Sequence, residues 1–366
     1  MNFVCFSQWS QLPESASELF AESERFSLFC SRIWLETITT HALSEHQTLL
    51  VACVVENENV LAILPMMQTS QAGQQSLGSL SNNFTSLYSP LVSQHSQQDV
   101  VLSCLAEGLA NNLANNLASN RLQISSQSIR FEPIDPNDVN MAKLRHFMEG
   151  FGFQSHSYLR FYNWIQLLGN QSFDAYMHER PANLRNTIKR KKRKLKREYD
   201  YHIQLFKDAD IDKAILSKAL EDYAAIYRAS WKAKEFFSEF TPALVTRLSK
   251  KGWLRLAILY ANEQPIAAQI WFVVHAKANI YRLVFDERWK SFSPGSILTE
   301  YVMRYAIDTD KVSEIDFLTG NERYKQDWMS VRKERVGIIF SKPSEKTNSF
   351  DRAMQCLKRL FLKNNP

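Results

Sequence analysis

Apolar residues in the second half of the chain form short runs that alternate with helix-like segments. After Gly252, three apolar runs of strand length follow one another across short polar turns: WLRLAILY, PIAAQIWFVVH and ANIYRLVF. Such runs predict a meander of three strands. A helix starting near Pro294 comes next, followed by the strand EIDFL, the polar helix NERYKQDWM and the strand VGIIF. Upstream, the short strand YHIQLF precedes two helices with apolar residues on one face.

The first half has a similar order with a weaker pattern. The runs TLLVACVVE and VLAILPMM predict a hairpin of buried strands, and a short strand is expected near Phe84–Tyr88. Leucines at mostly four-residue spacing predict a helix over 100–117. The strand SIRFEPI, a helix near Asn140–Gly150 and the long strand FQSHSYLRFYNWIQLL follow. The repeated order indicates an internal duplication with a period of roughly 165 to 190 residues. A last amphipathic helix is expected over Ser344–Lys363.

Length and composition favour a globular chain of two domains. The 366 residues are 45% hydrophobic, which is enough for a core in each domain. No apolar run reaches the roughly 18 residues of a membrane span, and the N-terminus lacks the features of a signal peptide, so a cytoplasmic location is expected. The five cysteines form no C-x-x-C pair, which favours buried reduced thiols. The eight histidines have no ligand spacing, so no metal is implied.

The formal net charge of +6 comes from one short segment. Nine of the thirteen residues from Arg185 to Arg197 are Lys or Arg, with Ile188 and Leu195 as the apolar anchors of a predicted helix. A solvated charged helix is the simplest interpretation. The alternatives are a contact with anionic lipid headgroups or a polyanionic acceptor, or with a nucleic acid such as tRNA. Aromatic residues for base stacking are not interleaved with the charges.

The segment SPGS at the start of the predicted helix near Pro294 is a candidate anion site. Ser293 suits the N-cap, Pro294 suits the first helical position, and Gly295 leaves the next backbone N–H sterically open. The N–H groups of Gly295, Ser296 and Ile297 would then point out of the helix start, where the dipole favours an anion. A pyrophosphate could bind there, although an ordinary capped helix would have the same sequence.

The order of elements resembles that of the GNAT superfamily of N-acyltransferases. The usual phosphate loop of that family, Q/R-x-x-G-x-G/A, is replaced here by SFSPGSIL. The chain more specifically resembles the CelD/BcsL-like acetyltransferases, which contain a BioF-like acetyltransferase domain and are related to the Fem peptidyltransferases. The resemblance covers about residues 150 to 340, and the first half only through its architecture and SLSNNFTSLYSPL. It is carried by W-x-Q (Trp164–Gln166), RPANLRNTIKRKKRKL, YRASW (Tyr227–Trp231), Gly252–Val273, SPGSIL (Ser293–Leu298) and DFLTGNERYKQDWM (Asp316–Met329).

The resemblance implies an α+β fold of two tandem GNAT-like domains, each with a mixed, mostly antiparallel sheet flanked by helices. The expected parts are a degenerate N-terminal domain (1–165), a basic connector (166–200), the acyltransferase domain (201–343) and a C-terminal helix (344–366). The expected co-substrate is acyl-CoA, most simply acetyl-CoA.

The resemblance also implies where the donor would bind. The strand Tyr281–Phe285 would hydrogen-bond the pantetheine arm, with Leu283 and Phe285 beside it, and the pyrophosphate would lie on Ser293–Ile297.

The residues for acyl transfer are expected after the strand EIDFL, which would face the thioester. Tyr324 is the candidate general acid for the departing thiolate, because a phenol is protonated at neutral pH. Glu322 or Asp316 could take the proton of the ammonium group, and Asp316 could instead be a cap or pair with Lys325. Lys325 could bind a carboxylate or phosphate of the substrate.

Two tryptophans are further candidates. Trp231 is expected to line the acceptor pocket or to fill the core, and packing is favoured for Trp328.

The expected reaction is transfer of an acetyl group to an amine of an amino sugar or another envelope or polysaccharide precursor. The first half has SPLVSQHSQQ in place of SPGSIL, with no glycine beside its Ser-Pro, so it is expected to bind no donor and to shape the acceptor groove. One alternative is a Fem-like transferase that uses aminoacyl-tRNA. Another is a non-catalytic protein that binds an anionic membrane or polyanion.

Overall fold

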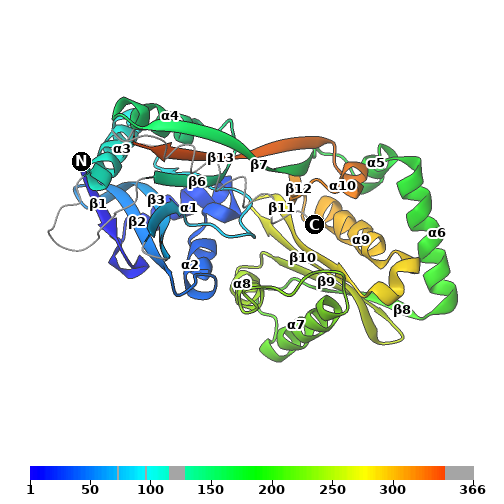
Figure 1. Ribbon diagram of the computed structural model, residues 1–366. Coiled ribbons are helices and arrows are strands. Elements are labelled where there is room, and N and C mark those ends of the chain that lie inside the picture. Colours follow the sequence, from blue (N-terminus) through cyan, green and yellow to red (C-terminus); the bar gives the residue numbers. More distant parts are fainter. Residues whose placement is uncertain (72–73, 95–96, 115–127, 343–366) are drawn as a thin grey trace.

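The computed structural model describes residues 1–71, 74–94, 97–114 and 128–342, in which the same order of elements occurs twice (Figure 1). The first half contains β1 (Asn2–Phe6), α1 (Ala16–Phe26), α2 (Arg32–His41), β2 (Gln47–Glu56), β3 (Asn59–Gln71), β4 (Gln74–Ser79), β5 (Leu91–Val92), α3 (Gln98–Ala114), β6 (Ser128–Ile134), α4 (Val139–Gly150) and β7 (Gln154–Leu167). The connector contains α5 (Phe173–His178) and α6 (Ala182–Glu198). The second half contains β8 (Tyr201–Phe206), α7 (Lys213–Arg228), α8 (Phe240–Ser249), β9 (Leu254–Ala261), β10 (Gln264–Val274), β11 (Lys277–Phe285), the 3-10 helix η3 (Glu287–Phe292), α9 (Pro294–Asp308), β12 (Glu314–Thr319), α10 (Tyr324–Trp328) and β13 (Val331–Ser341). The predicted duplication of element order is therefore present.

The two halves share one sheet because they exchange their last strands. The strand order is β1-β2-β3-β4-β6-β13-β7-β12-β11-β10-β9-β8, with β5 on β3. The closing strand of the second half, β13, pairs with β6 of the first half, and β7 of the first half pairs with β12 of the second. The two exchanged strands pair with each other from Val331–Ile165 to Ser341–Gln154. They run as a long ribbon across both halves in Figure 1.

Helices cover both faces of this sheet, so its central strands are apolar on both sides. In β9, Leu256 and Ile258 belong to a core with α2, α7 and α8, whereas Ala257 and Leu259 belong to the core under α6 and α9. A strand buried on both faces has a continuous apolar run in place of alternation, which explains the sequence WLRLAILY.

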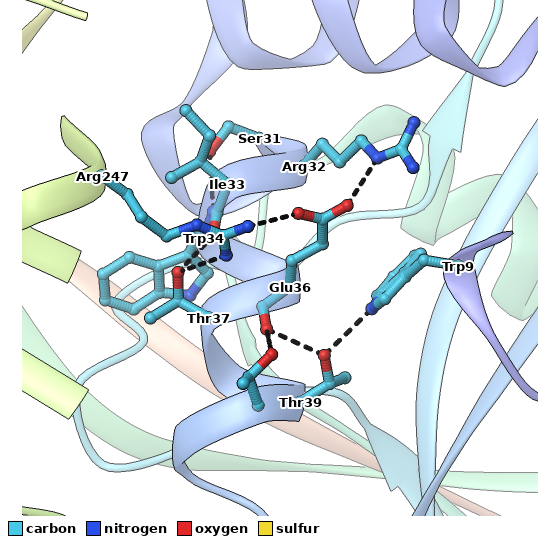
Figure 2. A network of polar contacts seen from close by, with 10 residues as sticks. Trp9, Ser31, Arg32, Ile33, Trp34, Glu36, Thr37, Thr39 and Arg247 are labelled. Carbon is cyan, nitrogen blue, oxygen red and sulfur yellow. Dashed lines mark hydrogen bonds and ion pairs between the residues drawn. The ribbon is translucent and has the colours of Figure 1, made fainter. Parts of the chain in front are cut away.

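One of the cores continues from the first half into the second. Trp34 of α2 is fully buried, and its ring contacts those of Phe240 and Tyr281 at centroid distances of 5.5 and 6.2 Å. Figure 2 shows the polar contacts beside this junction. Arg247 of α8 donates to Glu36 Oε2 at 2.7 Å and to Thr37 Oγ1 at 3.0 Å, and Arg32 donates to Glu36 Oε1 at 2.7 Å (Figure 2). The halves are thus joined by strand pairing, by apolar contacts and by an ion-pair network.

The strand expected near Phe84–Tyr88 was wrong. This segment is irregular and lies between β4 and β5. Its backbone groups bond to other partners, since Thr85 N–H donates to the Asn82 carbonyl at 3.0 Å and Tyr88 N–H to the Pro133 carbonyl at 2.6 Å.

Three further expectations concern segments and side chains outside the active region. The predicted helix over 100–117 corresponds to α3, of which the described part ends at Ala114, and the helix expected over Ser344–Lys363 lies outside the described residues. Within the described ranges, no helix combines the length and apolarity needed to cross a bilayer. The four described cysteines are unpaired: Cys30 and Cys53 are buried, Cys5 and Cys104 are partly exposed, and Cys356 lies outside these ranges.

Candidate active site

A cavity opens where two parallel strands of the second half separate. β11 and β12 are paired only over Lys277–Asn279 and Glu314–Asp316. Beyond these pairs lies a cavity of about 560 Å³, bounded by both strands, by the first residues of α6 and α9, and by α10. Past Asn279, β11 therefore borders a space into which an extended ligand could add as a strand.

Asp316 stabilises the bend that separates the two strands. The pairing of β12 with β7 shifts register between Asp316 and Thr319, and Leu318 has a φ of 55°. Asp316 Oδ1 accepts the Leu318 N–H at 2.6 Å, and Asn163 Nδ2 donates to Oδ2 at 3.0 Å. Burial raises the pKa of Asp316, and the charge of Arg335 opposes this shift. Asp316 lies outside the lining of this cavity and both of its carboxylate oxygens accept hydrogen bonds, which fits the capping alternative, while its part in proton transfer stays a prediction.

The start of α9 forms the floor at one end of the cavity. A Cβ atom at Gly295 would lie 3.3 Å from Phe285 Cδ1 and 3.4 Å from Leu283 Cδ2, so glycine allows α9 to approach β11 closely. Gln269 Nε2 donates to the Gly295 carbonyl at 3.1 Å and fixes this turn. Within the described residues the Gly295 N–H has no acceptor, and the Ser293 side chain makes no capping bond.

The expected set of three free N–H groups is reduced to one. Ser293 has a left-handed backbone conformation, with φ 52° and ψ 50°, and its carbonyl accepts the N–H groups of Ser296 at 3.1 Å and Ile297 at 3.2 Å. The Ile297 side chain is fully buried in the core under α9. An anion here would therefore meet the Gly295 N–H and the polar side chains that line this end, Ser293, Ser296 and Lys290.

Tyr324 and Glu322 line the cavity together. Tyr324 is 44% exposed and its ring meets that of Phe317 edge to face, with centroids 5.8 Å apart. Burial and the charge of Glu322 raise the pKa of Tyr324, so the phenol is protonated at neutral pH. Its hydroxyl has no hydrogen-bond partner among the described residues, which leaves it available to a ligand.

Lys325 is held by its own turn. Its ammonium donates to the carbonyls of Phe317 at 3.3 Å and Thr319 at 2.7 Å, and it lies 3.0 Å from Glu322 Oε2. The residue is only 3% exposed, and three acceptors occupy its three protons. A substrate anion at Lys325 would have to replace one of them. Trp328 is buried in the core, and its carbonyl accepts the Tyr176 hydroxyl at 2.5 Å, which agrees with the packing role favoured for it.

The lining also contains groups that the sequence did not single out. Trp231 is 49% exposed and lies against Phe285 at 4.6 Å, as expected for a wall residue, and the next residue, Lys232, also lines the cavity. Arg282 pairs with Glu235 at 2.8 Å, and its guanidinium lies 4.2 Å from the ring centroid of Phe84.

Different signals could have found these residues. Lys232 directly follows YRASW, and Phe84 lies within SLSNNFTSLYSPL, so both were close to segments that carried the resemblance. Nothing local could have placed Phe84 beside Arg282, because the two residues lie in different halves of the chain.

The corresponding place in the first half is bridged by protein groups. β4 and β6 are parallel and pair only at Leu77–Ile129 and Gly78–Arg130. Just beyond, the hydroxyl groups of Ser79 and Ser81 donate to the Glu132 carbonyl, and Tyr88 stacks on Phe131 with centroids 5.8 Å apart. The segment after β4 therefore fills the gap that stays open in the second half. In the described chain, no group of three or more His, Cys, Asp or Glu side chains could hold a metal ion.

Comparisons with known proteins agree with this geometry. Residues 182–326 match the family model described as an acetyltransferase (GNAT) domain. Comparison of the sequence with curated proteins gave no match.

Three solved structures share the fold over nearly the whole chain. The crystal structure of FemX has a TM-score of 0.61 at 9% identity, over 92% of this chain and 96% of the other. A conserved protein of unknown function from Bacteroides thetaiotaomicron has a TM-score of 0.54 at 10% identity, over 92% and 99%. The C-terminal domain assigned to a lysylphosphatidylglycerol synthetase from Agrobacterium fabrum has a TM-score of 0.52 at 11% identity, over 90% and 95%. The chain therefore has a GNAT-like α+β fold, and its residues 182–326 form a GNAT acyltransferase domain.

Proposed function

We propose that this chain transfers an acetyl group from acetyl-CoA to the amine of an amino sugar or of another envelope or polysaccharide precursor. The supporting observation is the separation of β11 from β12, which opens a cavity that extends to the start of α9. The acceptor class rests on the resemblance to the CelD/BcsL-like acetyltransferases.

The residues present fit an acyl-CoA. The backbone of β11 beyond Asn279 would hydrogen-bond the pantetheine arm, with Leu283 and Phe285 as its apolar wall. The Gly295 N–H, the two serine hydroxyls at the start of α9 and the Lys290 ammonium would hold the pyrophosphate. This arrangement would direct the thioester towards α10.

Tyr324 and Glu322 would then handle the protons of acyl transfer. Glu322, directly or through water, takes the proton that the acceptor ammonium must lose before its nitrogen can attack the thioester carbonyl carbon. A C–N bond forms, the C–S bond breaks, and the thiolate of CoA takes the proton of the Tyr324 hydroxyl. The Tyr324 phenolate takes the second proton that the attacking nitrogen loses, and solvent removes the first proton from Glu322, so the net products are the amide, free CoA and one proton.

The first half would form part of the acceptor groove and bind no donor. Its own strand gap is bridged by the segment after β4, and the same segment brings Asn83 and Phe84 to the cavity of the second half. The acceptor would therefore enter beside Phe84 and Trp231.

Isothermal titration of acetyl-CoA tests the donor site with a matched pair of variants. Ser296→Glu adds a carboxylate where the pyrophosphate would bind, while a helix N-terminus tolerates the charge. We expect the Kd to rise at least about tenfold, whereas Ser217→Glu on the exposed start of α7 keeps the wild-type value. Failure of the wild-type protein to bind CoA, acetyl-CoA or longer acyl-CoAs would overturn the proposal, as would unchanged binding by Ser296→Glu.

A Fem-like transferase that uses aminoacyl-tRNA is the second candidate, and the exposed face of α6 favours it. Leu184, Ile188 and Leu195 are buried against the protein, and Lys192 pairs with Glu300 at 2.5 Å. On the opposite side, five cations recur every one to three residues and are exposed: Lys189, Arg190, Arg193, Lys196 and Arg197. Figure 1 places α6 at the outer edge of the molecule.

Salt dependence distinguishes these alternatives. A tRNA-dependent enzyme would bind tRNA with an affinity that falls steeply with salt and that is lost when Lys189, Arg190 and Arg193 are changed to Gln. A non-catalytic protein would bind anionic vesicles through the same residues and would gain no thermal stability from any CoA. If the protein binds acetyl-CoA but neither tRNA nor anionic vesicles, only the acetyl-CoA-dependent transferase remains.

A further inference from the structure

Lys232 is a cation of the cavity lining that forms no ion pair within the described residues. It lies in the loop between α7 and α8 and lines the cavity with Trp231, Arg282 and Tyr324. Its backbone N–H donates to Ser230 Oγ at 3.3 Å, but within the described chain its ammonium has no hydrogen-bond or ion-pair partner.

The other cations of the lining are balanced or lie at the donor end. Arg282 pairs with Glu235 at 2.8 Å, and Lys325 lies 3.0 Å from Glu322. Lys290 precedes α9 and faces the proposed pyrophosphate position. Of Lys232, Arg282 and Lys325, only Lys232 therefore lacks an ion-pair partner within the described residues.

The surroundings make this charge unfavourable while the cavity contains no anion. Burial and the charge of Arg282 lower the pKa of Lys232 to about 8, and the carboxylates of Glu235 and Glu322 only partly oppose them. A partly buried ammonium is stabilised most by an anion that comes into direct contact with it. Since no carboxylate of the described chain is in contact with this ammonium, an anionic group of a ligand could take that place.

We propose that Lys232 binds an anionic group, a carboxylate or a phosphate, of the acceptor. Arg282 adds positive potential but is itself fixed, because Glu235 pairs with it and the rings of Phe84 and Tyr281 lie 4.2 and 4.6 Å from it. The inference rests on the proposed function, in which the acceptor enters beside Phe84 and Trp231. The acceptor then carries an amine near Glu322 and an anionic group near Lys232.

A role of Lys232 as a general base would require a different protonation state. A base must be neutral before it takes a proton, whereas at neutral pH a lysine with a pKa of about 8 is mostly charged. A charged lysine suits anion binding, and a bound anion would raise its pKa further.

Sulfate binding tests the site without any reaction, since sulfate is fully charged at neutral and alkaline pH. Sulfate would also bind at the start of α9. Every protein used in the isothermal titrations therefore carries Ser296→Glu, which blocks that second position. We expect Ser296→Glu to bind sulfate at about pH 7, with binding at least about tenfold weaker at about pH 9.5 as Lys232 loses its proton. Adding Lys232→Met should abolish binding, and adding Lys234→Met, at the exposed second residue along, should leave it unchanged.

Two results would overturn the assignment: no sulfate binding by Ser296→Glu, or equal binding with Lys232 and with Met at that position. A variant with Lys232→Arg, which keeps the charge, should retain binding and so separates charge from folding. Titration of the wild-type protein with acetyl-CoA tests the proposed function independently, because the proposed donor site does not include Lys232.

Kinetics with paired acceptors extend the test to turnover. Glucosamine and glucosamine 6-phosphate carry the same amine, and an α-amino acid can be compared with its amide. We expect the anionic member to have the higher kcat/KM, and Lys232→Met to lower that value about tenfold through KM while leaving the neutral member unchanged. An equal loss of kcat for both members would assign Lys232 to proton transfer and overturn the anion site.

Discussion

At the scale of single residues, adjacent side chains of the segment after β12 differ in whether they are available to a ligand. The Tyr324 hydroxyl has no hydrogen-bond partner in the described part of the chain, whereas the ammonium protons of Lys325 are used by Phe317, Thr319 and Glu322. Tyr324 can therefore donate a proton or a hydrogen bond to a ligand, whereas Lys325 cannot do so without losing one of its present partners.

Tyr324→Phe should lower kcat for acetyl transfer by about a hundredfold, since it removes the proton donated to the thiolate. Acetyl-CoA affinity should stay within about twofold, because the ring and its contact with Phe317 remain. A thiol-release assay with stopped-flow detection measures this, with Tyr301→Phe on the exposed side of α9 as the matched control. Equal kcat for both variants would exclude Tyr324 as the acid.

Lys232 should also make stability depend on pH. Its pKa is about 8 in the folded protein against 10.5 for the free side chain, so the unfolded chain binds the additional proton between these values. The free energy of unfolding therefore rises with pH over this window, and the unfavourable charge is fully present below it. Urea denaturation should show Lys232→Met to be more stable than wild type at pH 7, with the difference shrinking as pH approaches 10. A difference in the free energy of unfolding that stays constant from pH 7 to 10 would contradict the lowered pKa of Lys232.

At the scale of elements, a buried hydrogen bond lies at the bend where the cavity opens. The Asp316 carboxylate accepts the Leu318 N–H at the point where β12 leaves β11. The start of α9 is fixed in a similar way by Gln269, so both ends of the cavity depend on side chains that bond to backbone.

Asp316→Ala should destabilise the protein by about 1–3 kcal/mol, because the Leu318 N–H and the Asn163 amide lose their buried acceptor. It should also weaken acetyl-CoA binding as β12 relaxes towards β11. Thermal denaturation and isothermal titration measure both effects, with Glu314→Ala in the same strand as control. A loss of kcat with unchanged stability and affinity would instead assign Asp316 to proton transfer.

At the scale of the whole molecule, the two halves form one continuous structure. Strand exchange places β13 in the sheet of the first half, and the core around Trp34 continues to Phe240. The first half can therefore shape the cavity of the second half through a fixed contact.

Arg247→Ala should lower the free energy of unfolding by about 1 kcal/mol, because Glu36 and the buried Thr37 lose their partner across the junction. Arg32→Ala removes a partner of the same Glu36 within α2 that is exposed to a similar degree, but it leaves Thr37 paired, so it should cost at most about half as much. Urea denaturation compares the two variants, and equal losses would mean that the bond across the junction adds nothing.

The sequence by itself determined the order of elements, the duplication and the start of the helix that borders the cavity. Apolar spacing and cap residues act over a few positions, so the meander, the start of α9 and the placement of Tyr324 and Glu322 after β12 could be read from neighbouring residues. Only the tertiary structure decided the strand exchange, the bridged gap of the first half, the place of Asp316 outside the cavity, the saturated ammonium of Lys325 and the meeting of Phe84 with Arg282. Each of these depends on which distant backbone and side-chain groups the topology brings within hydrogen-bond or van der Waals distance. The local pattern of residues does not determine these long-range contacts.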